Sequence, residues 1–113
     1  MSHITTHVLD VSLGRPAANV PVILEALTAG GAWTQAGRGS TDADGRWKDL
    51  APAKTLEAGT YRLIFDTRSY FATRRIEGLY PQVIIVFELK DEREHYHIPL
   101  LLSPYGYSTY RGS

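Results

Sequence analysis

The chain has 113 residues, enough to bury a core of its own, and we expect one domain spanning residues 1–113. Its 12 basic and 12 acidic residues balance, which argues against nucleic acid or an anionic membrane as a partner. No cysteine is present, which excludes a disulfide framework, a thiolate nucleophile and a sulfur-ligated zinc site.

The sequence shows none of the targeting signals considered next. Residues 1–7 lack the basic start and apolar stretch of a secretory signal, and no later segment approaches the length of a membrane span. The final Arg-Gly-Ser differs from the Ser-Lys-Leu address of peroxisomal proteins. We therefore expect a soluble cytoplasmic protein, rather than a peroxisomal one, with no membrane partner.

The first half of the chain predicts short β-strands separated by turns. Runs rich in valine, isoleucine, tyrosine and threonine alternate with glycine, proline and aspartate clusters, as is typical of a many-stranded β protein. Strands are predicted over residues 4–11, 20–27 and 33–40. The segment 42–45, Asp-Ala-Asp-Gly, predicts a tight turn that leads into Arg46 and the next strand.

The middle of the chain predicts two further strands with a helix between them. Residues 60–66 and 81–89 have the composition of strands. Over residues 67–76 aromatic and basic side chains fall at helical spacing instead. We expect Ser69 to cap this short helix and Gly78 to end it.

The last block, residues 95–110, predicts two strands that form a hairpin. It splits at Pro104-Tyr105-Gly106, a combination that favours a turn. Seven or eight short strands with one helix favour a β-sandwich, in which two sheets bury alternate side chains against each other. An up-and-down barrel is the alternative architecture.

Histidine and arginine residues are the candidates for chemistry. His95 and His97 are two residues apart, so their side chains point to the same side of a strand, and His7 lies on the first strand. An imidazole near neutral pH can accept a proton from water or return one to a leaving nitrogen. A guanidinium such as that of Arg46 or Arg111 offers a fixed fork to an oxygen-rich ring. Singly, each of these residues is more often a plain surface side chain.

Other chemistries receive less support from the sequence. His7, His95 and His97 could form a three-histidine metal site, although nothing in the sequence fixes the geometry of the third ligand. The Asp-Ala-Asp-Gly segment lacks the bidentate glutamate of a calcium-binding EF-hand loop. No serine stands in a Gly-x-Ser-x-Gly motif, so a serine-hydrolase triad has no support.

Three separated blocks carry a resemblance that spans essentially the whole chain. They are His7-Val8-Leu9-Asp10 followed by Gly14-Arg15-Pro16-Ala17, then Asp44-Gly45-Arg46, and last residues 95–113 ending in Tyr110-Arg111-Gly112-Ser113. In these blocks the chain resembles the transthyretin-like 5-hydroxyisourate hydrolases. The closing Tyr-Arg-Gly-Ser distinguishes these hydrolases from transthyretin proper, the hormone carrier of the same fold.

The resemblance implies an all-β, transthyretin-like β-sandwich of two four-stranded sheets with one short helix. It also implies a homotetramer, a dimer of dimers, whose active sites lie between the dimers and are completed by neighbouring subunits. No metal and no cofactor are implied.

The implied reaction is hydrolysis of 5-hydroxyisourate to 2-oxo-4-hydroxy-4-carboxy-5-ureidoimidazoline, a step of urate degradation. The resemblance assigns catalysis to His7, Arg46 and His97. It assigns substrate binding to His7, Arg46, Tyr110, Arg111, Gly112 and Ser113. As a hypothesis, one of the two histidines activates water and the other protonates the leaving nitrogen, and the residues alone leave open which is the base. A ligand-carrying module and a purely structural sandwich are the competing functions.

Overall fold

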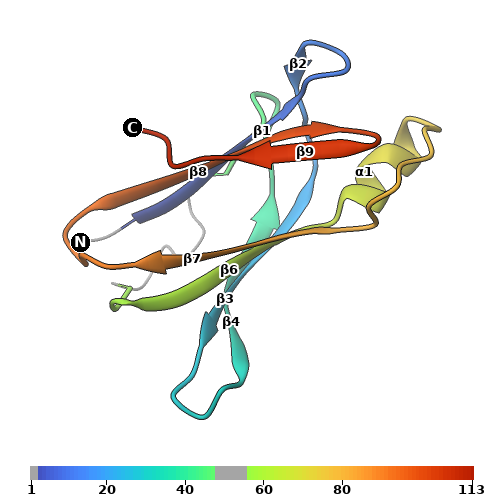
Figure 1. The fold of residues 1–113 in the computed structure, drawn as a ribbon. Helices are drawn as coiled ribbons and strands as arrows, with labels where there is room; N and C mark the ends of the chain where they lie inside the picture. Colours follow the sequence, from blue (N-terminus) through green and yellow to red (C-terminus); the bar gives the residue numbers. More distant parts are fainter. Residues whose placement is uncertain (1–2, 48–55) are drawn as a thin grey trace.

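The computed structural model describes residues 3–47 and 56–113, which form two β-sheets and a short helix (Figure 1). The first sheet contains β1 (His3–Asp10), β2 (Arg15–Pro16), β5 (Arg46–Trp47), β8 (His95–Ser103) and β9 (Gly106–Thr109). The second sheet contains β3 (Pro21–Leu27), β4 (Trp33–Ser40), β6 (Gly59–Phe65) and β7 (Val83–Leu89). The predicted sandwich is therefore confirmed. Most predicted strand boundaries are within one or two residues of the observed ones.

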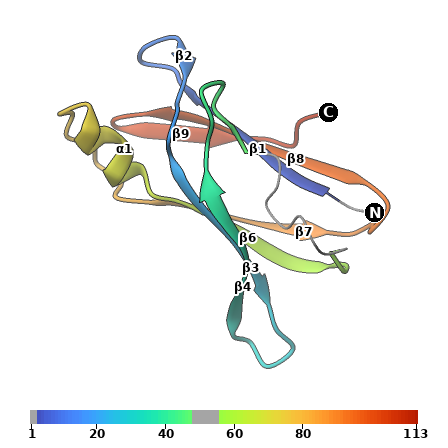
Figure 2. The same cartoon turned by 180° about the vertical axis from the view of Figure 1, so that it is seen from behind.

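The order of the strands sets which residues become neighbours. The second sheet runs β4-β3-β6-β7, and the first runs β2-β1-β8-β9 with β5 also pairing with β1. The first sheet thus gains a fifth, two-residue strand beyond the four expected. Its central pair, β1 and β8, is parallel, with Thr5 opposite His97 and His7 opposite Pro99. Both of these strands begin, and the chain ends, on the side of the molecule away from the helix (Figures 1 and 2).

Alternation along the strands separates the core from an outer face. On β1 the side chains of Ile4, Thr6, Val8 and Asp10 are buried, whereas those between them are half-buried. Val8 and Leu100 of the first sheet belong to the same apolar cluster as Leu63 of the second. Because side chains alternate across a strand, His7 of β1 and the two histidines of β8 lie on the face directed away from this cluster.

The helix α1 (Thr67–Thr73) begins where the helical pattern was predicted to begin, but its cap and its last residue differ from those predicted. Its N-cap is Asp66, whose side chain accepts a hydrogen bond from the Ser69 backbone N–H at 3.0 Å, so the prediction of Ser69 as the cap was wrong. Arg75 has a φ of 56° and already reverses the chain before Gly78. In the part of the chain that the structure describes, no helix has the length and apolarity to cross a bilayer.

A buried carboxylate ties the helix to the first sheet. Asp10 has no exposed surface and accepts hydrogen bonds from the Tyr70 hydroxyl at 2.7 Å and from the backbone and hydroxyl of Ser12. Burial alone would raise the pKa of Asp10, but the hydrogen bonds from Ser12, Tyr70 and Leu13 outweigh it and lower the pKa. Burial and the adjacent Asp10 carboxylate raise the pKa of Tyr70 to about 12.

Replacing Tyr70 by phenylalanine is expected to destabilise the fold without changing its shape. The change removes the hydroxyl that donates to the buried Asp10 carboxylate. A hydrogen bond to a charged group contributes about 1.5–3 kcal/mol, so the free energy of unfolding in urea should fall by that amount. An unchanged free energy of unfolding would contradict this role for the Tyr70 hydroxyl.

Candidate active site

A group of imidazoles and one guanidinium occupies the outer face of the first sheet. This group, which we call the outer cluster, consists of Thr5 and His7 on β1, Arg46 on β5, and His95 and His97 on β8. The pairing of β1 with both β5 and β8 brings these residues together although they are far apart in the sequence.

The turn before β5 positions Arg46 beside His7. Gly45 has a φ of 77°, and a side chain there would collide with the backbone oxygen of Val8. That close approach lets the Val8 N–H donate to the Gly45 carbonyl at 2.7 Å. The Asp42 side chain accepts a hydrogen bond from the Arg46 N–H at 3.0 Å. The turn therefore places Arg46 directly opposite His7 in the sheet.

The hydrogen-bond partner of His7 determines which ring nitrogen carries the hydrogen. Its Nε2 lies 2.9 Å from the carbonyl oxygen of Asp44. A carbonyl oxygen can only accept a hydrogen bond, so Nε2 must carry the hydrogen. In neutral His7 the lone pair is therefore on Nδ1.

A threonine that sequence reasoning did not single out lies between the other two histidines. The Thr5 hydroxyl oxygen is 2.7 Å from His95 Nε2 and 2.8 Å from His97 Nδ1. The only signal in the sequence was its place two residues before His7, on the same face of the predicted strand. The structure also shows that His95 and His97 point to the same side, with ring centroids 6.4 Å apart.

The surroundings of His97 favour its neutral form. The side chain is half-buried, and burial lowers its pKa below the ordinary histidine value of 6.5. Repulsion by His7, His95 and Arg46, in decreasing order, lowers the pKa further. At neutral pH the ring is thus uncharged and able to accept a proton.

An NMR titration of His97 checks this electrostatic arrangement. Its midpoint should lie below 6.5, and replacing Arg46 by glutamine should raise it, because one of the positive charges that oppose protonation is removed. The matched change Arg38→Gln on β4, in the second sheet, should leave the midpoint where it is. A midpoint that is insensitive to Arg46 would contradict the arrangement.

The C-terminal residues are divided between two faces of the first sheet. The Gly112 N–H donates to the His97 carbonyl at 2.7 Å, and a Cβ on Gly112 would lie 2.5 Å from His97 Cδ2. The Arg111 guanidinium instead lies over the ring of Tyr96, 4.2 Å from its centroid, and forms a 3.1 Å ion pair with Glu94. The structure thus brings Gly112 to His97 and turns Arg111 away from it. Tyr110 and Ser113 are exposed.

A metal site is not formed by these residues. Within residues 3–47 and 56–113, no three histidine, cysteine, aspartate or glutamate side chains are arranged to hold a metal ion. His7 and His97 are instead held by hydrogen bonds to a backbone carbonyl and to a hydroxyl. What the outer cluster offers chemically is two imidazoles able to transfer protons beside a fixed positive charge.

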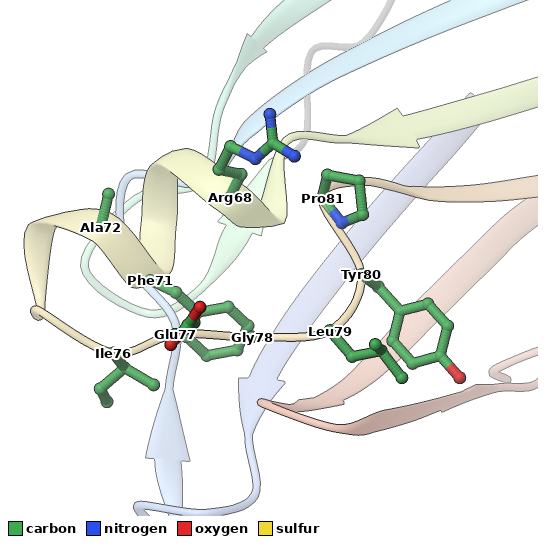
Figure 3. A pocket seen from close by; sticks show the side chains of 9 residues that line it. All are labelled: Arg68, Phe71, Ala72, Ile76, Glu77, Gly78, Leu79, Tyr80 and Pro81. Carbon is green, nitrogen blue, oxygen red and sulfur yellow. The ribbon is translucent and has the colours of Figure 1, made fainter.

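Three open cavities lie away from the histidines of the outer cluster. A cavity of about 260 Å³ lies beside α1, where Phe71 and the loop residues Gly78 and Tyr80 contribute to its wall (Figure 3). Two larger cavities, of about 620 and 540 Å³, border the second sheet. None of these three is lined by His7, Arg46 or His97. Within a single chain Arg46 and His95 are exposed and Thr5, His7 and His97 are half-buried, so the outer cluster is open to solvent.

The fold and the outer cluster define a two-sheet β-sandwich with imidazoles and a guanidinium gathered on the outer face of one sheet. A family model described as the HIUase/Transthyretin family matches residues 4–112, so the chain belongs to the HIUase/Transthyretin family. It is 47% identical to the 5-hydroxyisourate hydrolase of Salmonella typhimurium over 97% of this chain and 80% of that protein.

Two solved structures support the same relationship. The 5-hydroxyisourate hydrolase of Klebsiella pneumoniae superposes with a TM-score of 0.88 at 36% identity, covering all of both chains. Sea bream transthyretin in complex with thyroxine superposes with a TM-score of 0.91 at 34% identity, covering 96% of this chain and 93% of that one. The family thus includes both hydrolases and a thyroxine-binding protein. The residues of the outer cluster are the evidence for choosing between these two functions.

Proposed function

We propose that this protein is a 5-hydroxyisourate hydrolase that acts in urate degradation and that the outer cluster is its active site. The observation that carries the proposal is a half-buried His97 on the same face as His7 and Arg46, where burial and these neighbours lower its pKa. A carrier needs no proton acceptor held beside a cation, whereas hydrolysis of an amide-like bond does. The identity to named hydrolases supports the same conclusion.

The proposed reaction adds one water molecule to the six-membered ring. Water attacks a ring carbonyl carbon while His97 accepts its proton, and Arg46 stabilises the negative charge that develops on the oxygen. The ring C–N bond then breaks, and a proton passes to the leaving nitrogen. The product carries a new carboxylate and a ureido group, which corresponds to 2-oxo-4-hydroxy-4-carboxy-5-ureidoimidazoline.

We assign the base role to His97 and the second proton transfer to His7. The lowered pKa of His97 favours the form that can take a proton from water. His7 Nε2 is held by the Asp44 carbonyl, so Nδ1 is the nitrogen that would take up a proton from solvent and pass it to the leaving nitrogen, while the proton that His97 took from water returns to solvent at the end of the cycle. The two rings would thus act on opposite ends of the same bond.

The C-terminal residues are proposed to complete the pocket. Tyr110, Gly112 and Ser113 would form a wall next to His97, where Gly112 already contacts the ring. For Arg111 to bind substrate, its guanidinium would have to leave Glu94. Both side chains of that ion pair are about half exposed, so breaking it would cost roughly 1 kcal/mol or less.

The active form is proposed to be a homotetramer, a dimer of dimers with the sites between the dimers. Its support is that the outer cluster lies on an open face, whereas chemistry of this kind benefits from exclusion of bulk water. A second copy of the same face, related by two-fold symmetry, would cover it. Light scattering should then give about four times the 12.6 kDa mass of one chain.

The alternative is a carrier, favoured by the likeness to the transthyretin complex with thyroxine. A urate oxidase coupled assay separates the two functions, because 5-hydroxyisourate has an ultraviolet signal whose decay can be followed. A hydrolase accelerates that decay in proportion to its concentration. A carrier binds the compound and leaves its decay at the rate in buffer, which would overturn the proposal.

A further inference from the structure

The hydroxyl of Thr5 connects two histidines that would otherwise be independent. Its oxygen lies within hydrogen-bonding distance of His95 Nε2 and of His97 Nδ1, at 2.7 and 2.8 Å. A hydroxyl has one hydrogen to donate and lone pairs to accept with. One of these two ring nitrogens therefore accepts the Thr5 hydrogen, and the other must donate its own.

Two arrangements of the hydrogens satisfy this requirement. They differ in whether Nε2, the His97 nitrogen that does not face Thr5, carries the lone pair or the hydrogen. If Thr5 donates to His95, then His97 Nδ1 carries a hydrogen and neutral His97 has its lone pair on Nε2. If Thr5 donates to His97, then Nδ1 carries the lone pair and Nε2 carries the hydrogen. Only the first arrangement leaves Nε2 able to accept a proton from water.

We propose that Thr5 is a positioning residue that couples the tautomer of His97 to His95 and keeps His97 Nε2 available as the base while His95 is neutral. This inference rests on the proposed function for its catalytic consequence, but the coupling itself is a property of the folded chain. It gives His95 a defined part in the site, as the group that receives the Thr5 hydrogen.

The coupling also explains how His97 can gain and lose a proton without breaking the hydrogen bonds that hold its ring in place. When water protonates Nε2, Nδ1 still donates to Thr5, and Thr5 still donates to His95. Every hydrogen bond on this chain of three residues is kept, so no reorganisation accompanies the proton transfer.

Protonation of His95 would switch the arrangement. A charged His95 carries hydrogens on both nitrogens, so its Nε2 must donate to Thr5, and the Thr5 hydrogen then turns to His97. The charged groups that face His97 are His7 on β1, Arg46 on β5 and His95 on β8, and all three oppose its protonation. His95 itself lies beside Arg111, whose guanidinium is 3.5 Å from the His95 carbonyl oxygen.

The test reads the tautomer directly by NMR of protein labelled with nitrogen-15 in histidine, at a pH where His95 and His97 are neutral. In the wild type, His97 should carry its hydrogen on Nδ1. Thr5→Val keeps the shape of the side chain and removes the hydroxyl, so the His97 hydrogen should move toward Nε2. Thr5→Ser keeps the hydroxyl and should keep the wild-type tautomer.

Activity provides the second measurement. With 5-hydroxyisourate, kcat of Thr5→Val should fall at least about tenfold while KM changes by less than about twofold, and Thr5→Ser should restore kcat. His95→Leu, at an exposed position, tests the same coupling if Thr5→Val fails to fold, because it removes the acceptor and should also move the His97 hydrogen to Nε2.

The outcomes separate the coupling from the proposed function. A His97 hydrogen that stays on Nδ1 in both Thr5→Val and His95→Leu would overturn the coupling, whatever the activity. Tautomers that shift as expected in a protein that does not accelerate the decay of 5-hydroxyisourate would support the coupling and overturn the proposed function.

Discussion

Replacing His97 by glutamine is expected to lower kcat/KM for 5-hydroxyisourate by about 10²–10⁴-fold, the usual contribution of a general base. Glutamine has a similar reach and can occupy the place beside Thr5, but its amide cannot take a proton from water. Because the half-buried ring is neutral at pH 7, the loss should be a loss of chemistry and not of a charge that binds substrate. The quantity to measure is the initial rate in the urate oxidase coupled assay.

The loss of activity counts as a catalytic effect only if the His97→Gln protein is still folded. The free energy of unfolding of His97→Gln should remain within about 1 kcal/mol of the wild type, because the ring lies on the outer face and not in the core. Glu88→Gln, an exposed change on β7, is the matched control and should keep full activity. Turnover by His97→Gln within threefold of the wild type would remove His97 from the mechanism.

Replacing Gly112 by alanine is expected to lower kcat by about 10²-fold, although the change adds only one methyl group. The new Cβ would lie 2.5 Å from His97 Cδ2, which is closer than carbon atoms can pack, and 3.2 Å from Cγ, which is a tight contact. Either the imidazole rotates away from Thr5, or the tail leaves its hydrogen bond to the His97 carbonyl. A displacement of about 1 Å at a catalytic group is enough for a loss of this size.

The control for Gly112→Ala is Gly106→Ala, at the start of β9. There the nearest atom to the added methyl group is Ser103 Oγ at 3.7 Å, an ordinary contact, so activity should be unchanged. The His97 ring signals in NMR should shift in Gly112→Ala and stay in place in Gly106→Ala. A fully active Gly112→Ala protein would show that the close approach of the tail does not position His97.

Much of the fold follows from local sequence patterns. The strand over residues 33–40 coincides with β4, and the hairpin turn at residues 104–105 lies where proline and glycine indicated it. The helix ends were less predictable, because Asp66 competes with Ser69 for the cap and lies one residue before the predicted start. Gly78 has a packing role instead, since a Cβ there would lie 3.1 Å from Phe71 Cδ2.

The outer cluster shows where sequence reasoning stops. Spacing alone placed His95 and His97 on one side of a strand, but it could not show that β1 lies parallel to β8 with Thr5 opposite His97. That register depends on the packing of the whole sandwich, so the hydroxyl between the two imidazoles was not foreseen. The resemblance assigns all of Tyr110 to Ser113 to substrate binding, whereas in the structure alternation turns Arg111 to the face opposite His97. The roles of these residues in catalysis remain predictions.

The reaction itself provides the most direct test of the account. Urate labelled with carbon-13 can be oxidised by urate oxidase in an NMR tube, and the fate of 5-hydroxyisourate can be followed with and without the protein. We expect its signals to be replaced by those of the ring-opened carboxylate at a rate proportional to the concentration of the protein. A time course identical to that in buffer, with the protein folded and assembled, would contradict the assignment of this chain as a hydrolase.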